Sequence, residues 1–164
     1  MARALPPEAA GMVFRRCRSS SERRAVGRLL AERGSTQDEP GVVGTDLFGL
    51  WDLTAPAGEA LAGAAAIGPL GDGGQVQLRG IAVAAVEGHR GLGRRLVCEV
   101  ADSLRARGAA RLVARPAGGA GPTLALLRNA GFVPAGAGRA PAPVSAPRSG
   151  VPADDEASWW ELEL

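Results

Sequence analysis

Residues 76–108 contain a strand pattern, a turn with two closely spaced glycines and a long helix pattern, in that order. The strand pattern is VQLRGIAV at 76–83, and the turn contains Gly91 and Gly93. The apolar side chains of the helix recur at intervals of three and four residues, at Leu92, Leu96, Val97, Val100 and Leu104. A strand that passes through a tight turn into an amphipathic helix is a unit of α/β folds, so this segment restricts the chain to that class.

Further strands and helices are predicted on both sides of this unit. Strands are expected at 12–17 (a sheet edge), at 47–53 and 60–67 (a hairpin), at 109–116, and at 158–164, where Trp160, Leu162 and Leu164 alternate with acids. Helices are expected at 121–132 and at 19–34, where Ser19 and Glu22 have the spacing of a capping box. The order β-α-β-β-β-α-β-α-β predicts a mixed sheet flanked by helices.

The length of 164 residues favours a single domain. We expect a loose N-terminal leader over residues 1–11 and one domain over residues 12–164. Residues 134–157 are rich in proline and alanine. Within that domain they are therefore expected to form an extended or disordered insertion before the last strand.

Charge and composition argue against several classes of function. The net charge is only +2, and the arginines are scattered among acids, which argues against nucleic-acid binding. The longest apolar run, ALAGAAAIGPL, is too short to span a membrane, and no signal peptide is recognisable, so we expect a cytoplasmic protein. Cys17 and Cys98 lack a CxxC or histidine partner. No metal site is therefore predicted, and Cys98 is expected to pack against the core.

The glycine turn before the long helix has the features of an anion site. A helix N-terminus presents unpaired amide groups and the positive end of the helix dipole, and glycines let an anion approach the backbone closely. Two common phosphate motifs are absent. A P-loop needs a lysine, and the chain contains none, while a dinucleotide fingerprint needs a third glycine where Leu96 stands.

Residues 81–114, IAVAAVEGHRGLGRRLVCEVADSLRARGAARLVA, resemble the acetyl-coenzyme A motif of the GNAT superfamily of N-acetyltransferases. In that family a strand ending in a V-x-P-like step leads through [QR]-x-x-G-x-[GA] into a long helix. Val83 matches the strand end here, and Gly91-Leu92-Gly93 matches G-x-G. The resemblance covers about residues 13–133. It implies an α/β (α+β) fold with a mixed, mostly antiparallel sheet flanked by helices, and an open V-shaped cleft between the strands at 76–83 and 109–115.

The resemblance implies acetyl-coenzyme A as co-substrate and places its site along the motif. Backbone groups of Ile81 and Val83, on either side of Ala82, would pair with the thioester and the pantetheine arm. The pyrophosphate would be held by the turn and the start of the helix, at Gly88, His89, Arg90, Gly91, Leu92, Gly93, Arg94 and Arg95. The ring of His89 is expected to be a surface side chain rather than a catalyst.

Three residues depart from the family pattern. Gly88 stands at the [QR] position, Ala85 at the proline position, and Leu127 where many members carry a tyrosine that protonates the leaving thiolate. The chain contains no tyrosine at all. Two functions therefore stay open. One is acyl transfer by direct attack of a primary amine on a small molecule or peptide; the other is a non-catalytic acyl-coenzyme A-binding or protein-interaction module of the same fold.

No catalytic residue is assigned from the sequence. Glu87, Asp46 and Asp52 could deprotonate the amine, but each is expected to be a turn or surface acid. Trp159 and Trp160 are expected in the last strand and the core. A cleft filled by Trp159 or by the insertion would favour the non-catalytic module. The family resemblance also admits a homodimer.

Overall fold

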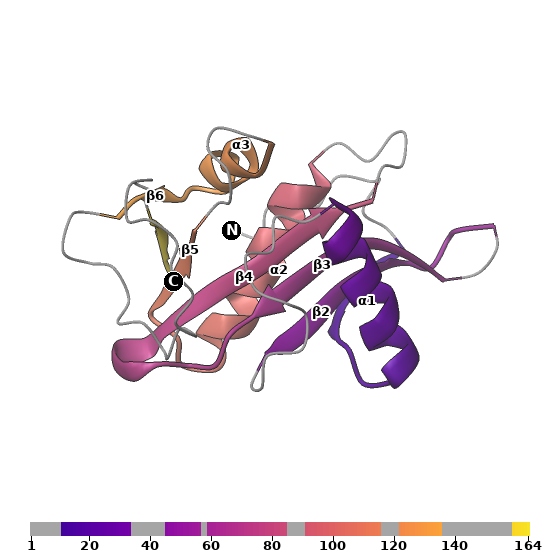
Figure 1. Ribbon diagram of the computed structural model, residues 1–164, viewed down its shortest axis with the longest axis horizontal. Coiled ribbons are helices and arrows are strands. Elements are labelled where there is room, and N and C mark those ends of the chain that lie inside the picture. Colours follow the sequence, from indigo (N-terminus) through magenta and orange to yellow (C-terminus); the bar gives the residue numbers. More distant parts are fainter. Residues whose placement is uncertain (1–10, 34–44, 57–58, 85–90, 116–121, 136–158) are drawn as a thin grey trace, which may run out of the picture.

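The computed structural model describes residues 11–33, 45–56, 59–84, 91–115, 122–135 and 159–164 (Figure 1). Together these segments form a seven-stranded sheet with three α-helices. The strands are β1 (Met12–Arg16), β2 (Asp46–Asp52), β3 (Ala60–Ile67), β4 (Gln75–Val83), β5 (Arg111–Ala114), β6 (Val133–Pro134) and β7 (Trp160–Glu163). The helices are α1 (Ser20–Arg33), α2 (Leu92–Arg105) and α3 (Pro122–Asn129), and a 3₁₀ turn, η2, spans Asp72–Gly74.

The strands lie in the order β1-β2-β3-β4-β5-β7-β6. β4 and β5 run parallel, and every other neighbouring pair is antiparallel. The predictions of a mixed, mostly antiparallel sheet and of an edge strand at the N-terminal end are therefore confirmed. The sequence does not predict β6, because its two residues are too few to show an alternating pattern.

Helices α1 and α2 cover opposite faces of the sheet (Figure 1). On one face, Val26 and Leu30 of α1 pack with small side chains of the central strands, including Ala64 and Ala82. On the other face lies the larger core cluster, and the apolar residues predicted for α2 are all buried in it: Leu92, Leu96, Val97, Val100 and Leu104. The sheet is thus covered on both sides in the part that contains β3 and β4.

The helix-end signals of the sequence are present in the structure. The Glu22 amide donates to Ser19 Oγ at 3.1 Å, and the Ser19 amide donates to Glu22 Oε2 at 3.2 Å, which is the predicted capping box. Gly108 after α2 and Gly131 after α3 have positive φ angles of 82° and 97°, a conformation that glycine adopts without steric cost.

The prediction for Cys98 is wrong, because its side chain is exposed. Cys98 follows Val97 on α2, and a helix turns by about 100° per residue, which carries it to the face opposite Leu92 and Leu96. In β7, Trp160 is buried as expected, but Glu161 is buried as well, with only 7% of its surface exposed. Alternation places Glu161 on the other side of the strand, where Arg111 of β5 lies beside it.

Most of the predicted leader (1–11) and of the predicted insertion (134–157) lies outside the described residues. So does Gly34, the last residue of the helix predicted at 19–34. The leader's last residue is described, and the Gly11 carbonyl accepts a hydrogen bond from the Leu53 amide at 2.8 Å. The division into leader, domain and insertion stays a prediction.

Candidate cofactor-binding site

β4 loses one of its two neighbours halfway along its length. It pairs with β5 from Gln75↔Arg111 to Leu78↔Ala114 and no further. Its pairing with β3 continues to Gly63↔Val83. The last five residues of β4, Arg79 to Val83, therefore have a strand partner on one side only within the described part of the chain. The pairing ends because β5 itself ends at Ala114, and this is the position where the family resemblance implies a cleft.

A β-bulge lies where the pairing of β4 with β5 ends. Ala66 is opposite Gly80 and Ile67 is opposite Leu78, so Arg79 is an extra residue on β4. A bulge bends its strand and increases the local twist, so β4 changes direction at this point. This bulge is not among the features predicted from the sequence. Gly80 is the signal that could have indicated it, since a glycine inside a strand often marks one.

Backbone direction along β4 singles out two of the predicted site residues. The Ala84 amide donates to the Ala62 carbonyl on β3 at 2.9 Å. Because successive residues of a strand point their backbone groups to opposite sides, Ile81 and Val83 direct theirs away from β3, toward the unpaired side. Ala82 between them pairs with β3, and its side chain packs on the α1 face.

The N-terminus of α2 begins at a left-handed glycine. Gly91 has φ 84° and ψ 4°, no side chain caps the helix, and its carbonyl accepts the first helical hydrogen bond from the Arg95 amide at 3.0 Å. A β-carbon at Gly91 would meet no atom of the described residues within 4 Å. The amides of the first helical turn have no acceptor within the helix, so this end of α2 can present them to an anion.

Gly93 brings the two halves of the predicted site together. A β-carbon at this position would lie 2.4 Å from Leu126 Cδ1 and 3.7 Å from Val83 Cγ2. The end of β4 and the first turn of α2 are therefore adjacent, and α3 packs on the same turn. The glycine permits this close packing, which is a role beyond ligand binding that the sequence motif alone does not indicate.

The charged residues near this turn differ in their surroundings. Arg94 is exposed and forms no ion pair with any described residue. Arg95 is half-buried, with Nε 3.7 Å from Glu99 Oε1 and Nη2 donating to the Met12 carbonyl at 3.4 Å. Three predicted residues of the turn, Gly88, His89 and Arg90, lie outside the described residues.

The position of the family tyrosine lies inside the core. Leu127 of α3 is fully buried and belongs to the cluster that also contains Ile81 and Leu96. An aliphatic side chain there supplies no proton to a leaving group. Trp159 lies beyond β5, on the β6 side of the sheet, where its carbonyl accepts a hydrogen bond from the Ala135 amide at 2.7 Å.

The acids considered as bases have structural contacts. Asp46 forms ion pairs with Arg16 and Arg107. Asp52 accepts hydrogen bonds from the Thr54 amide at 2.8 Å and from Thr54 Oγ1 at 2.7 Å, as expected of a turn acid. Glu87 lies outside the described residues.

The displaced pKa values resolved for the described residues belong to groups of β1, of α1 and of the segment between them. Hydrogen bonds from the Arg18 amide, the Arg15 guanidinium and the Ser19 amide lower the pKa of Glu22 to about 2. Burial raises the pKa of the Cys17 thiol.

No helix in the described part of the chain is long and apolar enough to cross a membrane. No group of three or more potential metal ligands occurs within it either.

The sheet order, a central strand that extends beyond its parallel neighbour, and a left-handed glycine at a helix N-terminus together define an acetyltransferase-like α/β domain. The profile of the acetyltransferase (GNAT) family matches residues 18–132, and the chain belongs to this family. The resemblance drawn from residues 81–114 is thereby confirmed. No curated protein matches the chain by sequence.

Solved structures share the fold. A GNAT-family acetyltransferase from Desulfovibrio desulfuricans is 25% identical with a TM-score of 0.63, and the match covers 93% of this chain and 98% of that one. A Bacillus subtilis acetyltransferase in complex with CoA is 14% identical with a TM-score of 0.61, over 93% and 99% of the two chains. Vibrio cholerae spermidine N-acetyltransferase, in complex with CoA and spermine, is 14% identical with a TM-score of 0.57, over 77% and 83%. At 14% identity the likeness establishes the fold and not the substrate.

Proposed function

We propose that the protein transfers the acetyl group of acetyl-coenzyme A to a primary amine by direct attack. The observation that carries the proposal is the adjacency of Val83 and Gly93, which sets the unpaired side of β4 beside the N-terminus of α2. A pantetheine arm can pair with the first, and a pyrophosphate can be bound by the second. Family membership and the CoA complex of the Bacillus subtilis structure support this assignment.

The residues implied by the sequence motif take distinct parts in this proposal. Backbone groups of Ile81 and Val83 extend the sheet onto the pantetheine arm. The amides of the first turn of α2 bind the pyrophosphate, together with those of the preceding turn, which includes Gly88, His89 and Arg90. Arg94 is the better placed arginine for phosphate, since it is exposed and Arg95 contacts Glu99 and Met12.

The chemistry needs no covalent enzyme intermediate. The amine nitrogen forms a bond to the thioester carbon, the carbon–sulfur bond breaks, the amine loses a proton and the thiolate gains one. Leu127 cannot donate that proton, so we propose that it comes from solvent. A positioned general acid typically contributes a factor of about 10²–10⁴, and the enzyme is therefore expected to be slower than members of the family that have one.

Leu127 is also the observation that favours the second candidate, a module that binds acyl-coenzyme A without catalysis. Both candidates require coenzyme A binding and differ only in turnover. The cytoplasmic location, the small-molecule or peptide acceptor and the homodimer stay predictions.

Calorimetric titration of acetyl-coenzyme A, followed by an assay of CoA release with a panel of primary amines, tests the proposal. Binding with amine-dependent CoA release supports an acetyltransferase. Binding without release for any amine supports the non-catalytic module. Absence of binding to acetyl-, propionyl- and free coenzyme A would show that the turn before α2 is only structural.

A further inference from the structure

We infer that Arg79 binds a carboxylate of the acceptor, so that the amine substrate is an amino carboxylic acid. This inference rests on the proposed function and names its substrate class. Four arginines are not exposed among the residues whose side chains are described: Arg15, Arg79, Arg95 and Arg111.

Three of these four arginines have a carboxylate partner. Arg15 pairs with Glu22 and Glu59, Arg95 with Glu99, and Arg111 with Glu161. Arg79 forms no ion pair with any described residue. Its Nη1 donates to Thr45 Oγ1 at 2.8 Å, while its Nε is buried and has no hydrogen-bond acceptor among the described residues. Its Nε packs against Gly68, while the rest of the guanidinium has no carboxylate partner among the described residues and can accept an anion that is supplied from outside.

Gly68 provides the space in which this guanidinium lies. A β-carbon at residue 68 would be 3.1 Å from Arg79 Nε and 3.6 Å from its Cζ. Any larger residue would press against the guanidinium. Within the described part of the chain Nη1 is the one nitrogen of this group with a hydrogen-bond acceptor, so the planar fork is left with donors for a carboxylate.

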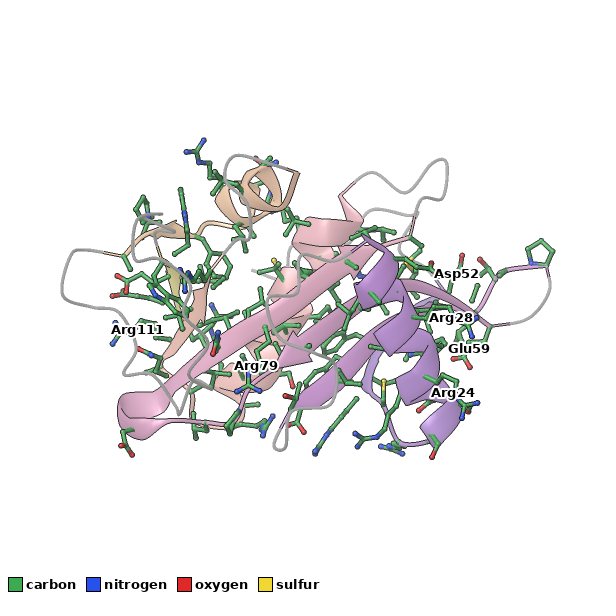
Figure 2. All side chains as sticks on the ribbon, in the orientation of Figure 1. Arg24, Arg28, Asp52, Glu59, Arg79 and Arg111 are labelled. Carbon is green, nitrogen blue, oxygen red and sulfur yellow. The ribbon has the colours of Figure 1, made fainter. Side chains whose placement is uncertain are left out.

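Arg79 lies on the face of the sheet opposite the one that carries the cluster with α2. Leu78 and Ile81 of β4 both pack in the cluster that contains α2, because the bulge interrupts the alternation between them. Gln77 and Arg79 both lie beside Gly68 on the opposite face, the one that α1 covers farther along. In Figure 2 the Arg79 side chain lies over the sheet between α1 and Arg111.

Along β4, Arg79 also lies close to the residue that is proposed to bind the thioester. Arg79 is the bulge residue, and it precedes by two positions the Ile81 backbone proposed to bind the thioester. The pyrophosphate site at α2 occupies one face of the sheet. An amine that attacks the thioester from the other face would therefore pass Arg79. A positive charge there attracts a carboxylate and repels a polycationic amine such as the spermine in the Vibrio cholerae complex.

The test compares amino acids with their C-terminal amides as acceptors, at acetyl-coenzyme A saturation and with rates corrected for the fraction of free amine. The wild type is expected to prefer the acids by about 10- to 100-fold in kcat/KM, the range of a hydrogen bond between charged groups. Arg79→Gln should abolish this preference, mainly through KM, without changing acetyl-coenzyme A binding. Gly68→Ala, which displaces the guanidinium but keeps its charge, should reduce the preference.

Arg24→Gln is the matched control, because Arg24 is an exposed residue of α1 and its loss removes the same charge. It should keep the preference. Thermal melting confirms that each variant folds, and Arg79→Lys retains the charge if Arg79→Gln does not fold. If no turnover is detected, the amino acids and their amides are titrated calorimetrically into the protein saturated with CoA. Binding of the acids but not of the amides, and weaker binding of the acids by Arg79→Lys, supports the inference.

Equal use or equal binding of acids and amides by the wild type would overturn the inference and leave the proposed function standing. A preference that persists in Arg79→Gln would overturn it as well. Failure of acetyl-coenzyme A to bind would overturn the proposed function and this inference together.

Discussion

Gly93 of α2 lies so close to Leu126 of α3 that a β-carbon at residue 93 would come within 2.4 Å of Leu126 Cδ1. The contact fixes the first turn of α2 between α3 and the end of β4. The position of α2 and the candidate ligand site therefore both require that residue 93 has no side chain.

Gly93→Ala is expected to lower the free energy of unfolding by about 1–3 kcal/mol, because the added methyl group overpacks this contact. Gly27→Ala is the matched control, since Gly27 lies in α1 and a β-carbon there would meet no described atom within 4 Å. It should raise the free energy of unfolding by about 0.4–1 kcal/mol. Urea denaturation measures both. Equal effects of the two substitutions would contradict the close packing.

Gly91→Glu should weaken acetyl-coenzyme A binding by at least about 100-fold, because it sets a negative charge beside the proposed pyrophosphate site. Gly108→Glu is its control at the other end of α2. Gly108 has almost the same φ, 82° against 84°, and the same open surroundings. Both variants should lose stability to left-handed strain, by about 1–2 kcal/mol, but only Gly91→Glu should lose affinity in calorimetry. Unchanged affinity in Gly91→Glu would remove the pyrophosphate from this turn.

Glu22 should make stability depend on acid pH. Its pKa is lowered from 4.5 to about 2, so the folded state favours the charged carboxylate. Its contribution is complete above pH 4.5 and is lost as the pH falls toward 2. The difference in melting temperature between the wild type and Glu22→Gln should shrink across that range. A constant difference for Glu22→Gln would contradict the capping box.

The two thiols should react at different rates with a disulfide reagent. Cys98 is exposed, whereas Cys17 is buried and burial raises the pKa of its thiol, which lowers the thiolate fraction. One thiol per chain should react rapidly and the second only under denaturing conditions. Cys98→Ser should eliminate the fast phase. A fast phase that survives in Cys98→Ser would show that Cys17 is accessible.

Much of the candidate site is local in sequence and could be predicted. The spacing from Val83 to the G-x-G at Gly91 and Gly93 lies within a single strand, turn and helix, so the residues that build the site are neighbours along the chain. The leucine at position 127, where many family members carry a tyrosine, could also be recognised, because that requires only a comparison with the family pattern. Neither Arg79 nor Glu161 could be assigned in this way. Each contacts a residue far along the chain: Arg79 donates to Thr45, 34 residues away, and Glu161 accepts from Arg111, 50 residues away.

Elements whose cause is short-range can be derived from the sequence alone. Periodic apolar residues specify the buried face of α2, and the side chains of Ser19 and Glu22 cap α1 because they lie three residues apart. The arrangement in three dimensions sets where the pairing of β4 with β5 ends, which residue the bulge adds, and that Gly93 faces Leu126. These are relations between segments that meet only after folding, and they follow from strand register and packing, which no local pattern of residues encodes.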